Sequence, residues 1–178
     1  MLMFPSGIFP GQGRVTWRDW YSHDVVNASI SANTTLSAPL GHIPVHIRDG
    51  SAILLHSTPG YTIAETLQSP YSLLVSQAAD GYAFGTAYFD DGESIPPTPN
   101  RNAQFHVSKG SLKIASSGTF TVGPKLATVT ILGTEKPTKV EVGGQSVNGW
   151  EFFEAQQKLV LSGLDVDLNS PATTITWQ

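Results

Sequence analysis

The sequence contains no cysteine, so a disulfide framework, a thiolate zinc site and a cysteine nucleophile are all excluded. Charged residues are also scarce, at 13% of 178 residues against roughly 25% in a typical soluble domain. The net charge is −4 and no run of Lys or Arg occurs, which argues against nucleic acid or an anionic membrane as a partner. No apolar stretch approaches the ~20 residues that span a bilayer, so no membrane partner is expected.

Several catalytic and cofactor-binding motifs are missing as well. The sequence has no GxSxG nucleophile elbow and no GxGxxG or GxxxxGKS/T loop of the kinds that bind phosphates. His42 and His46 are four residues apart, but Pro44 and the alternating pattern place them on a strand, about 13 Å from each other. One metal ion cannot bind both from a regular strand, and we expect neither a metal site nor a cofactor.

Helical spacing of apolar residues is rare, whereas alternation with a period of two is common. Ile63–Gln68 is the one stretch that suggests a helix. Strands are expected at His42–Ile47, Ala52–Leu55, Tyr71–Val75, Tyr82–Phe89, Gln104–Val107, Ser111–Ile114, Thr119–Val122, Ala127–Leu132, Thr138–Val142, Trp150–Phe153, Lys158–Ser162, Asp165–Leu168 and Thr173–Trp177.

Turn residues between the runs indicate which strands are joined by tight turns. Asp80-Gly81 stands between two of the runs, and such a pair is the strongest short-range signal for a β-hairpin. We therefore expect Tyr71–Val75 and Tyr82–Phe89 to form that hairpin. Many short strands without interleaved helices predict an all-β fold, an antiparallel β-sandwich. A change from a Trp- and Pro-rich segment to regular hairpins near Ser69-Pro70 predicts two small modules in tandem, 1–68 and 69–178.

Three carboxylates, Asp90, Asp91 and Glu93, crowd around Gly92 in the stretch AYFDDGES. A glycosidase needs two carboxyl groups about 5–9.5 Å apart that face one substrate, whereas adjacent strand residues point to opposite faces. A turn could bring Asp90 and Glu93 together. The alternative is a strand that ends in a tight turn whose geometry Asp and Gly supply, and this interpretation is favoured.

Aromatic residues gather in WRDWY and in WEFF. Trp17, Trp20 and Tyr21 fit an interface with another domain as well as a place in a core, because Trp20 and Tyr21 cannot both face one side of a strand. Trp150 and Phe152 are candidates for stacking against sugar rings, with core packing as the alternative.

The N-terminal MLMFPSGIFPG is apolar, but it lacks a basic region and Pro5 interrupts it, so it does not fit a signal peptide. Asn27-Ala28-Ser29 and Asn33-Thr34-Thr35 are N-glycosylation sequons. They predict glycans on Asn27 and Asn33 in a protein that is secreted or enters the secretory pathway, with export directed by sequence that this chain lacks.

Taken in order, four stretches resemble the region that follows the catalytic barrel in glycoside hydrolase family 31, above all in the secreted fungal α-glucosidases. They are WRDWY, APLGHIPVHIRDGSAIL, the Thr-x-x-Glu element of YTIAETLQSPYSLLV, and GTAYFDDGES. The family pattern is approximately W-Y-D-W-Y, then H-I-P-V-x-x-R-G-G-x-I-L, then L-Y-x-D-D-G-E-S. The tail from LATVTILGTEKPTKVEVGGQSV to LDVDLNSPATTITW is also similar to the end of these proteins, so the resemblance covers nearly the whole chain.

The resemblance implies a (β/α)8 barrel that carries the catalytic aspartates, followed by a proximal β-sandwich matching 1–68 and a distal one matching 69–178. It assigns the AYFDDGES carboxylates to a motif of the distal sandwich, and the family's nucleophile motif W-x-D-M-N-E is absent from this sequence. Arg18 stands where the family has Tyr, and Asp49 replaces the first Gly of Arg-Gly-Gly. The barrel is then the expected partner, contacted through Trp17, Trp20, Tyr21, His46 and Arg48.

The expected function is therefore that of a non-catalytic C-terminal β-sandwich portion of an α-glucosidase-like enzyme, whose parent reaction is retaining hydrolysis of terminal α-linked glucose. The chain alone is expected to be inactive. Two alternatives stay open: a free carbohydrate-binding module for α-glucan or maltooligosaccharide, and a small hydrolase that uses Asp90, Asp91 or Glu93.

Overall fold

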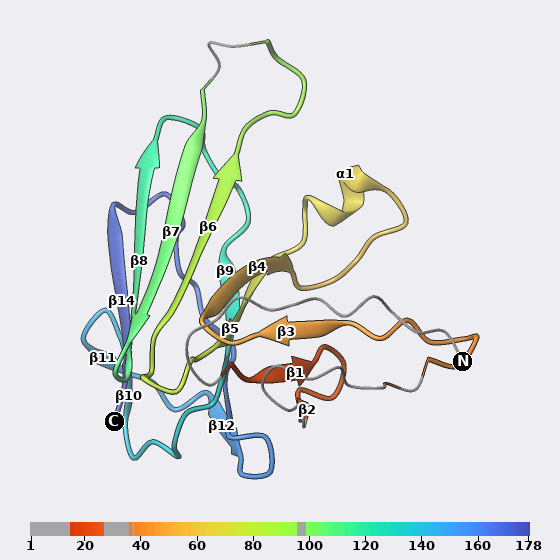
Figure 1. Cartoon of the computed structure of the whole chain (residues 1–178). Coiled ribbons are helices and arrows are strands. Elements are labelled where there is room, and N and C mark those ends of the chain that lie inside the picture. Colours follow the sequence, from red (N-terminus) through yellow and green to blue (C-terminus); the bar gives the residue numbers. More distant parts are fainter. Residues whose placement is uncertain (1–14, 27–35, 37, 96–98) are drawn as a thin grey trace.

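The computed structural model describes residues 15–26, 36, 38–95 and 99–178, and within these residues the fold is almost entirely β (Figure 1). A three-stranded sheet has the order β2 (Val25–Val26), β1 (Trp17–Asp19), β3 (His46–Arg48). An 11-stranded sheet has the order β11 (Gln145–Ser146), β10 (Val140–Val142), β14 (Ala172–Trp177), β8 (Ser111–Gly118), β7 (Arg101–Ser108), β6 (Ala83–Phe89), β4 (Ser51–His56), β5 (Tyr71–Ser76), β9 (Leu126–Leu132), β13 (Lys158–Leu161), β12 (Trp150–Phe153).

The predicted all-β class is confirmed, and the sheet pairings add detail to it. Neighbouring strands are antiparallel except in two pairs, β4 with β6 and β5 with β9, which run parallel. The large sheet is therefore mixed. It curls so that side chains from both of its arms meet in one apolar core, with Leu73, Phe105, Ile114, Leu126, Ile131, Leu159, Leu168 and Ile175 among its fully buried or nearly fully buried members.

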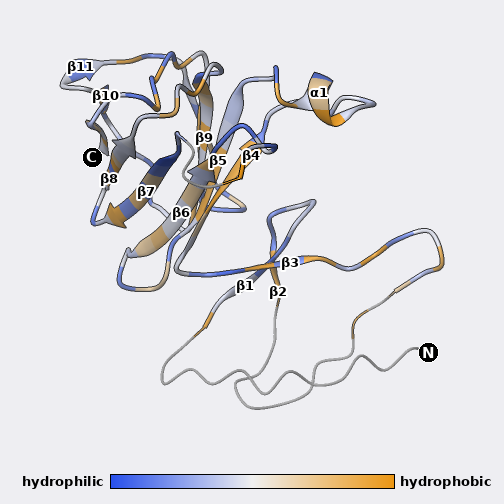
Figure 2. Cartoon of the chain, turned by 90° about the horizontal axis from the view of Figure 1, so that it is seen from above, coloured by the Kyte–Doolittle hydropathy of each residue, from blue (hydrophilic) through white to orange (hydrophobic). Residues whose placement is uncertain are grey.

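Strands β4 and β5 are covered on both faces, as the continuous apolar run of Ala52–Leu55 predicts. Ala52 and Leu54 belong to the main core, whereas Ile53 and Leu55 pack against a second cluster formed by Ile47, Leu74 and Leu132. The three-stranded sheet supplies Ile47 and lies beside β4 and β5 (Figure 2). The large sheet begins at Ser51, since β4 pairs with β5. The division into two modules at Ser69-Pro70 stays a prediction.

The predicted hairpin of Tyr71–Val75 with Tyr82–Phe89 is wrong, although a local turn is present. Gly81 has φ +80 and donates its N–H to Ala78 O. The two strands do not pair, because β4 lies between β5 and β6 in the sheet. The apolar β4 pairs along its whole length with β5 and thereby occupies the edge that a hairpin partner would need.

The helix α1 (Ile63–Thr66) forms where the sequence predicts one, and it ends before Gln68. The Thr62 hydroxyl accepts the Glu65 N–H at 3.2 Å, and the Glu65 carboxylate accepts the Thr62 N–H at 3.3 Å. This reciprocal capping box fixes the start of a helix that is too short to be stable by itself.

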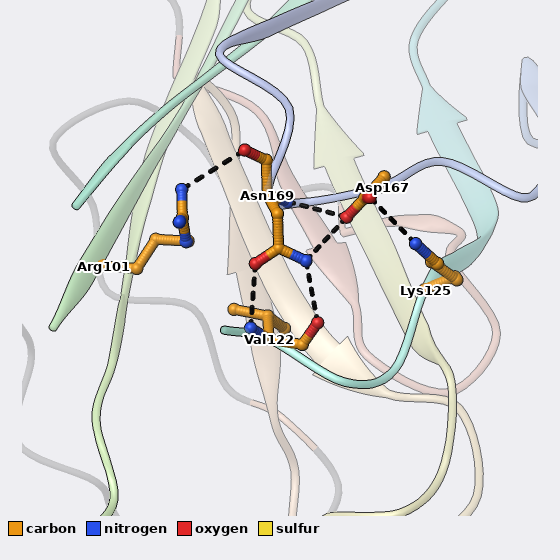
Figure 3. Close-up of polar contacts among 5 residues, drawn as sticks. All are labelled: Arg101, Val122, Lys125, Asp167 and Asn169. Carbon is orange, nitrogen blue, oxygen red and sulfur yellow. Dashed lines mark hydrogen bonds and ion pairs between the residues drawn. The ribbon is translucent and has the colours of Figure 1, made fainter. Parts of the chain in front are cut away.

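Two predicted strands, Thr119–Val122 and Asp165–Leu168, do not form, apart from a single bridge between Val166 and Leu126. A side chain takes the place of the ladder (Figure 3). Asn169 Oδ1 accepts the Val122 N–H and Asn169 Nδ2 donates to Val122 O, both at 2.9 Å. The backbone of the buried Val122 thus needs no neighbouring strand.

Asp167 holds this clamp in position. Its Oδ1 accepts the Asn169 backbone N–H at 2.8 Å and the Asn169 Nδ2–H at 2.7 Å, and its Oδ2 forms an ion pair with Lys125 at 2.9 Å (Figure 3). These contacts, the Asn169 N–H first, lower the pKa of Asp167 to about 2. The carboxylate therefore stays ionised at any physiological pH.

Candidate functional site: the outer face of the three-stranded sheet

The register of the three-stranded sheet decides which of its side chains share a face. β1 and β3 pair with Trp17 opposite Arg48, Arg18 opposite Ile47, and Asp19 opposite His46. Directly paired residues lie on one face, and successive residues alternate. Trp17 and Arg48 therefore share a face with His46, and Arg18 and Ile47 lie on the other.

The inner face carries Arg18 and Ile47, which are 3% and 2% exposed. Ile47 packs with Leu74 and Leu132 of the large sheet, and Trp20, one of the predicted interface residues, packs against the same cluster. The structure therefore separates Trp20 from the outward-facing residues. It points inward, while Tyr21 is 58% exposed.

Arg18 connects the small sheet to the turn between β12 and β13. Its Nη1 donates to His23 O at 3.1 Å and to Gln156 O at 2.9 Å, while Gln156 Nε2 donates to Asp24 Oδ1 at 2.9 Å. Burial lowers the pKa of Arg18, and the nearby carboxylates of Asp24 and Asp49 oppose this effect. The departure from the family's Tyr thus places a buried cation at the junction of the two sheets.

The second departure, Asp49, is accommodated without backbone strain. Asp49 Oδ2 accepts the Thr16 N–H at 2.7 Å, and the Asp49 N–H donates to Thr16 O at 2.9 Å. The positive φ of the turn, +73, falls on Gly50. Only the second glycine of the family's Arg-Gly-Gly is therefore required by the backbone here.

The outer face combines aromatic, cationic and apolar groups. Tyr21 donates its hydroxyl to Ile43 O at 3.2 Å, and its ring contacts the His42 ring in a tilted arrangement with 4.9 Å between the centroids. Ile43 is 75% exposed, and Arg48 is also exposed. A face built in this way can bury aromatic and aliphatic surface against a partner.

Two of the three carboxylates of AYFDDGES, Asp90 and Asp91, cap a turn. Asp90 Oδ1 accepts the Gly92 N–H at 2.9 Å, and Asp91 Oδ1 accepts the N–H groups of Glu93 and Ser94 at 3.1 and 2.9 Å. Asp91 Oδ2 accepts the Ser94 hydroxyl, and this bond leads the hydrogen bonds that lower the pKa of Asp91. All of these side chains are exposed, and Gly92 has φ +72. The arrangement is that of an Asx-type turn.

The candidates for sugar stacking, Trp150 and Phe152, are both partly buried and pack against the main core. The exposed aromatic residue of β12 is Phe153, whose ring lies 4.3 Å from the Lys158 ammonium. Stacking of sugars on Trp150 or Phe152 stays a prediction, and their packing against the core favours a structural role.

Three further observations complete the description of possible sites. Asn27 and Asn33 lie outside the described residues. Within the described ranges, no three His, Asp or Glu side chains are grouped as a metal site would require. The same part of the chain has no helix with the length and apolar character of a membrane span. An open groove lies between β4 and β6, and neither strand carried a signal for it in the sequence.

The described residues thus define an all-β region in which Asp90 and Asp91 cap a turn and Trp150 and Phe152 pack against the main core. No model of a protein family matches the chain. The chain is 37% identical over 175 residues to an α-glucosidase of Schizosaccharomyces pombe, covering 98% of this chain and 18% of that protein. An uncharacterised family 31 glucosidase of the same organism is 36% identical, covering 97% of this chain and 18% of the relative.

A crystal structure of a glucosidase II α subunit matches with a TM-score of 0.76 and 22% identity, covering 92% of this chain and 20% of that chain, which shows a shared fold. The chain belongs to glycoside hydrolase family 31, and the resemblance seen in the sequence motifs is confirmed. It spans less than a fifth of the length of the two relatives.

Proposed function

We propose that this chain is the scaffold portion of an α-glucosidase-like enzyme and packs against that enzyme's catalytic (β/α)8 barrel. The parent reaction is retaining hydrolysis of terminal α-linked glucose. The observation that carries the proposal is the unequal coverage, 98% of this chain against 18% of the S. pombe α-glucosidase. A segment of that size and all-β fold leaves the catalytic acids to the remaining polypeptide.

The outer face of the three-stranded sheet is the surface proposed to meet the barrel. Trp17, His46 and Arg48 share this face through the β1–β3 register, and Tyr21 and Ile43 are exposed next to them. Burial of aromatic and aliphatic groups provides the main driving force for such docking, at about 25 cal/mol per Å² of apolar surface. Exposed apolar groups of this kind also promote association when a partner is lacking.

The proposal predicts two results with p-nitrophenyl α-glucoside. The 178-residue chain alone should not hydrolyse it above the buffer rate. A chimera, in which the chain replaces the matched 175 residues of the S. pombe α-glucosidase, should hydrolyse it. In the chimera, Ile43→Lys should reduce activity at least about tenfold, because a lysine at a buried interface position loses apolar contact and must be desolvated.

The matched control is Ile95→Lys, because Ile95 is even more exposed than Ile43 and lies beside the AYFDDGES turn rather than beside the small sheet. It should leave the activity of the chimera unchanged. Hydrolysis by the isolated chain that Asp91→Asn abolishes would contradict the scaffold role. Quenching of Trp fluorescence by maltooligosaccharide, lost in Trp150→Ala, would instead support the carbohydrate-binding alternative.

We also propose that the parent enzyme passes through the secretory pathway and carries glycans on Asn27 and Asn33. The support is the two sequons. Expression behind a signal peptide in a eukaryotic host should give a product whose mass falls on treatment with an N-glycosidase. Asn27→Gln and Asn33→Gln should each remove one glycan. If neither substitution reduces the mass that the N-glycosidase releases, the assignment is refuted.

A further inference from the structure

Strands β4 and β6 separate soon after they meet. Their parallel register consists of Ser51 opposite Phe84, while β4 continues to His56 and β6 to Phe89 (Figure 1). Between the diverging strands lies an open groove of about 930 Å³. Its walls come from β4 and β6. Residues of α1 and its C-terminal end, Tyr71, the loop 120–124, and Asp90, Asp91 and Gly92 of the AYFDDGES turn complete its lining.

The alternating direction of peptide groups along a strand shows which N–H and C=O groups of β4 face this groove. The Ser57 N–H donates to Pro70 O at 2.7 Å, on the β5 side, and Gly50 O accepts the Phe84 N–H at 3.0 Å, on the β6 side. Successive residues of a strand present their N–H and C=O groups to alternate sides. Leu54 and His56 therefore present theirs to the groove, beyond the last β4–β6 pair.

The same argument holds for β6. The Phe84 N–H points toward β4, so Thr86 and Tyr88 present their N–H and C=O groups to the groove. Gly85 and Ala87 are paired with Phe105 and Ala103 and face β7 instead. The groove thus has a strand on each side, and the peptide groups of Leu54, His56, Thr86 and Tyr88 are directed toward it.

The side chains around the groove are mainly apolar. Leu54 and Phe89 pack against the main core, and Tyr71 meets Phe89 at 5.7 Å between ring centroids. Ile63 of α1 is 80% exposed and Leu67, the residue that follows the helix, is 51% exposed, although both line the groove. Apolar side chains between two strands match an extended peptide, whose backbone can pair with the strands. Asp90 and Asp91 also line the groove and would offer polar partners to a sugar, so a sugar is the alternative that the test must exclude.

We infer that an extended segment of the glucosidase polypeptide outside this chain adds as a strand between β4 and β6. The inference rests on the proposed function. The occupant is argued from length, because more than four-fifths of the S. pombe α-glucosidase lies outside the matched region. Strand addition satisfies the peptide groups of both edges and covers the apolar lining, and natural proteins rarely leave such edges open.

Hydrogen exchange with single-residue resolution, by mass spectrometry with electron-transfer fragmentation, tests this inference on the isolated chain. The amides of Leu54, His56, Thr86 and Tyr88 should exchange at least about tenfold faster than those of Ile53, Leu55, Gly85 and Ala87. Equal protection of the two sets would mean that the groove-facing amides are already bonded, and would overturn the inference.

The second arm compares the isolated chain with the chimera described above and with the intact S. pombe α-glucosidase. The four groove-facing amides, or their aligned equivalents, should become at least about tenfold more protected in both proteins. Continued fast exchange in an active chimera would overturn strand addition and leave the scaffold role intact. If the chimera does not fold, the intact relative decides. Protection of the isolated chain by maltotetraose alone would identify a glucan site and also overturn the inference.

The outer-face variant keeps the two proposals distinguishable. Ile43 precedes β3 and its carbonyl oxygen accepts the Tyr21 hydroxyl beside the outer face, and it does not line the groove. In the chimera, Ile43→Lys should lower activity while the four groove-facing amides stay protected. Loss of that protection together with activity would show that the groove has no occupant of its own, and would refute strand addition as an independent contact.

Discussion

Replacing Gly85 with alanine is expected to lower the free energy of unfolding by about 3 kcal/mol or more. An ideal Cβ at Gly85 would lie 1.8 Å from the carbonyl oxygen of Ala52, at the point where β6 crosses β4. The obstacle is backbone, so no change of rotamer relieves it, and the two strands must move apart. That movement would disturb Ala52 itself and Phe105, which pairs with Gly85, and both are buried in the main core.

Urea unfolding followed by Trp fluorescence measures this loss. Gly123→Ala is the matched control, because no heavy atom lies within 4 Å of a Cβ built there and the backbone is not in the left-handed region. It should change the free energy of unfolding by less than about 0.5 kcal/mol. A similarly small effect of Gly85→Ala would show that β4 and β6 do not approach each other this closely.

Local patterns predicted most of the strands, although the strand expected at His42–Ile47 begins only at His46. Arg101, Ala103, Phe105 and Val107 alternate with exposed residues along β7, and WEFF forms a strand with the predicted bounds. Alternation and turn chemistry act within a few residues, so they can be read from the sequence. The capping box of α1 is local in the same way, since Thr62 and Glu65 lie three residues apart.

Strand order depends on contacts that the sequence does not display locally. The Asp80-Gly81 signal formed a turn, yet β4 inserted between the strands on either side because its apolar residues are buried on both faces there. The side chain of Asn169 bonds the backbone of Val122, 47 residues away in sequence, where a strand was predicted. A side chain that acts over such a separation leaves no periodic signal.

Part of the candidate site could be predicted from the sequence. Alternation in WRDWY already separates Arg18 from Trp17 and Asp19, but a charged residue is normally assigned to solvent, so its burial was not predicted. The shared face of Trp17 and Arg48 required the β1–β3 register, which only the folded chain provides. The groove between β4 and β6 follows from the divergence of two strands and had no signal in either strand alone.

Substituting Arg18 with methionine is the second large perturbation, with an expected loss of about 3 kcal/mol in the free energy of unfolding. Methionine keeps most of the side-chain volume but leaves His23 O and Gln156 O without the donor that Arg18 Nη1 provides. It also removes the cation that faces Asp24 and Asp49. The bonds from Arg18 to Gln156 and from Gln156 to Asp24 join the small sheet to the β12–β13 turn, so the small sheet should loosen first.

Two measurements separate this local effect from general destabilisation. Limited proteolysis of Arg18→Met should cut near residues 15–26 at urea concentrations that leave the large sheet folded, and Trp fluorescence should report the same early transition through Trp17 and Trp20. Lys139→Met, which removes an exposed ion pair with Glu141, is the control and should cost less than about 0.5 kcal/mol. If Arg18→Met behaves like this control, Arg18 is not the buried cation that joins the sheets.

A double-mutant cycle with Asp49→Asn identifies the cause of the loss. Asp49 is buried, and its charge raises the pKa of Arg18. In the Arg18→Met background, Asp49→Asn removes a carboxylate that has lost its cation and keeps an acceptor for the Thr16 N–H. It should therefore be at least about 1 kcal/mol less costly there than in the unmodified chain. Additive losses would mean that the lost hydrogen bonds to His23 O and Gln156 O, and not the uncompensated charge, account for the effect of Arg18→Met.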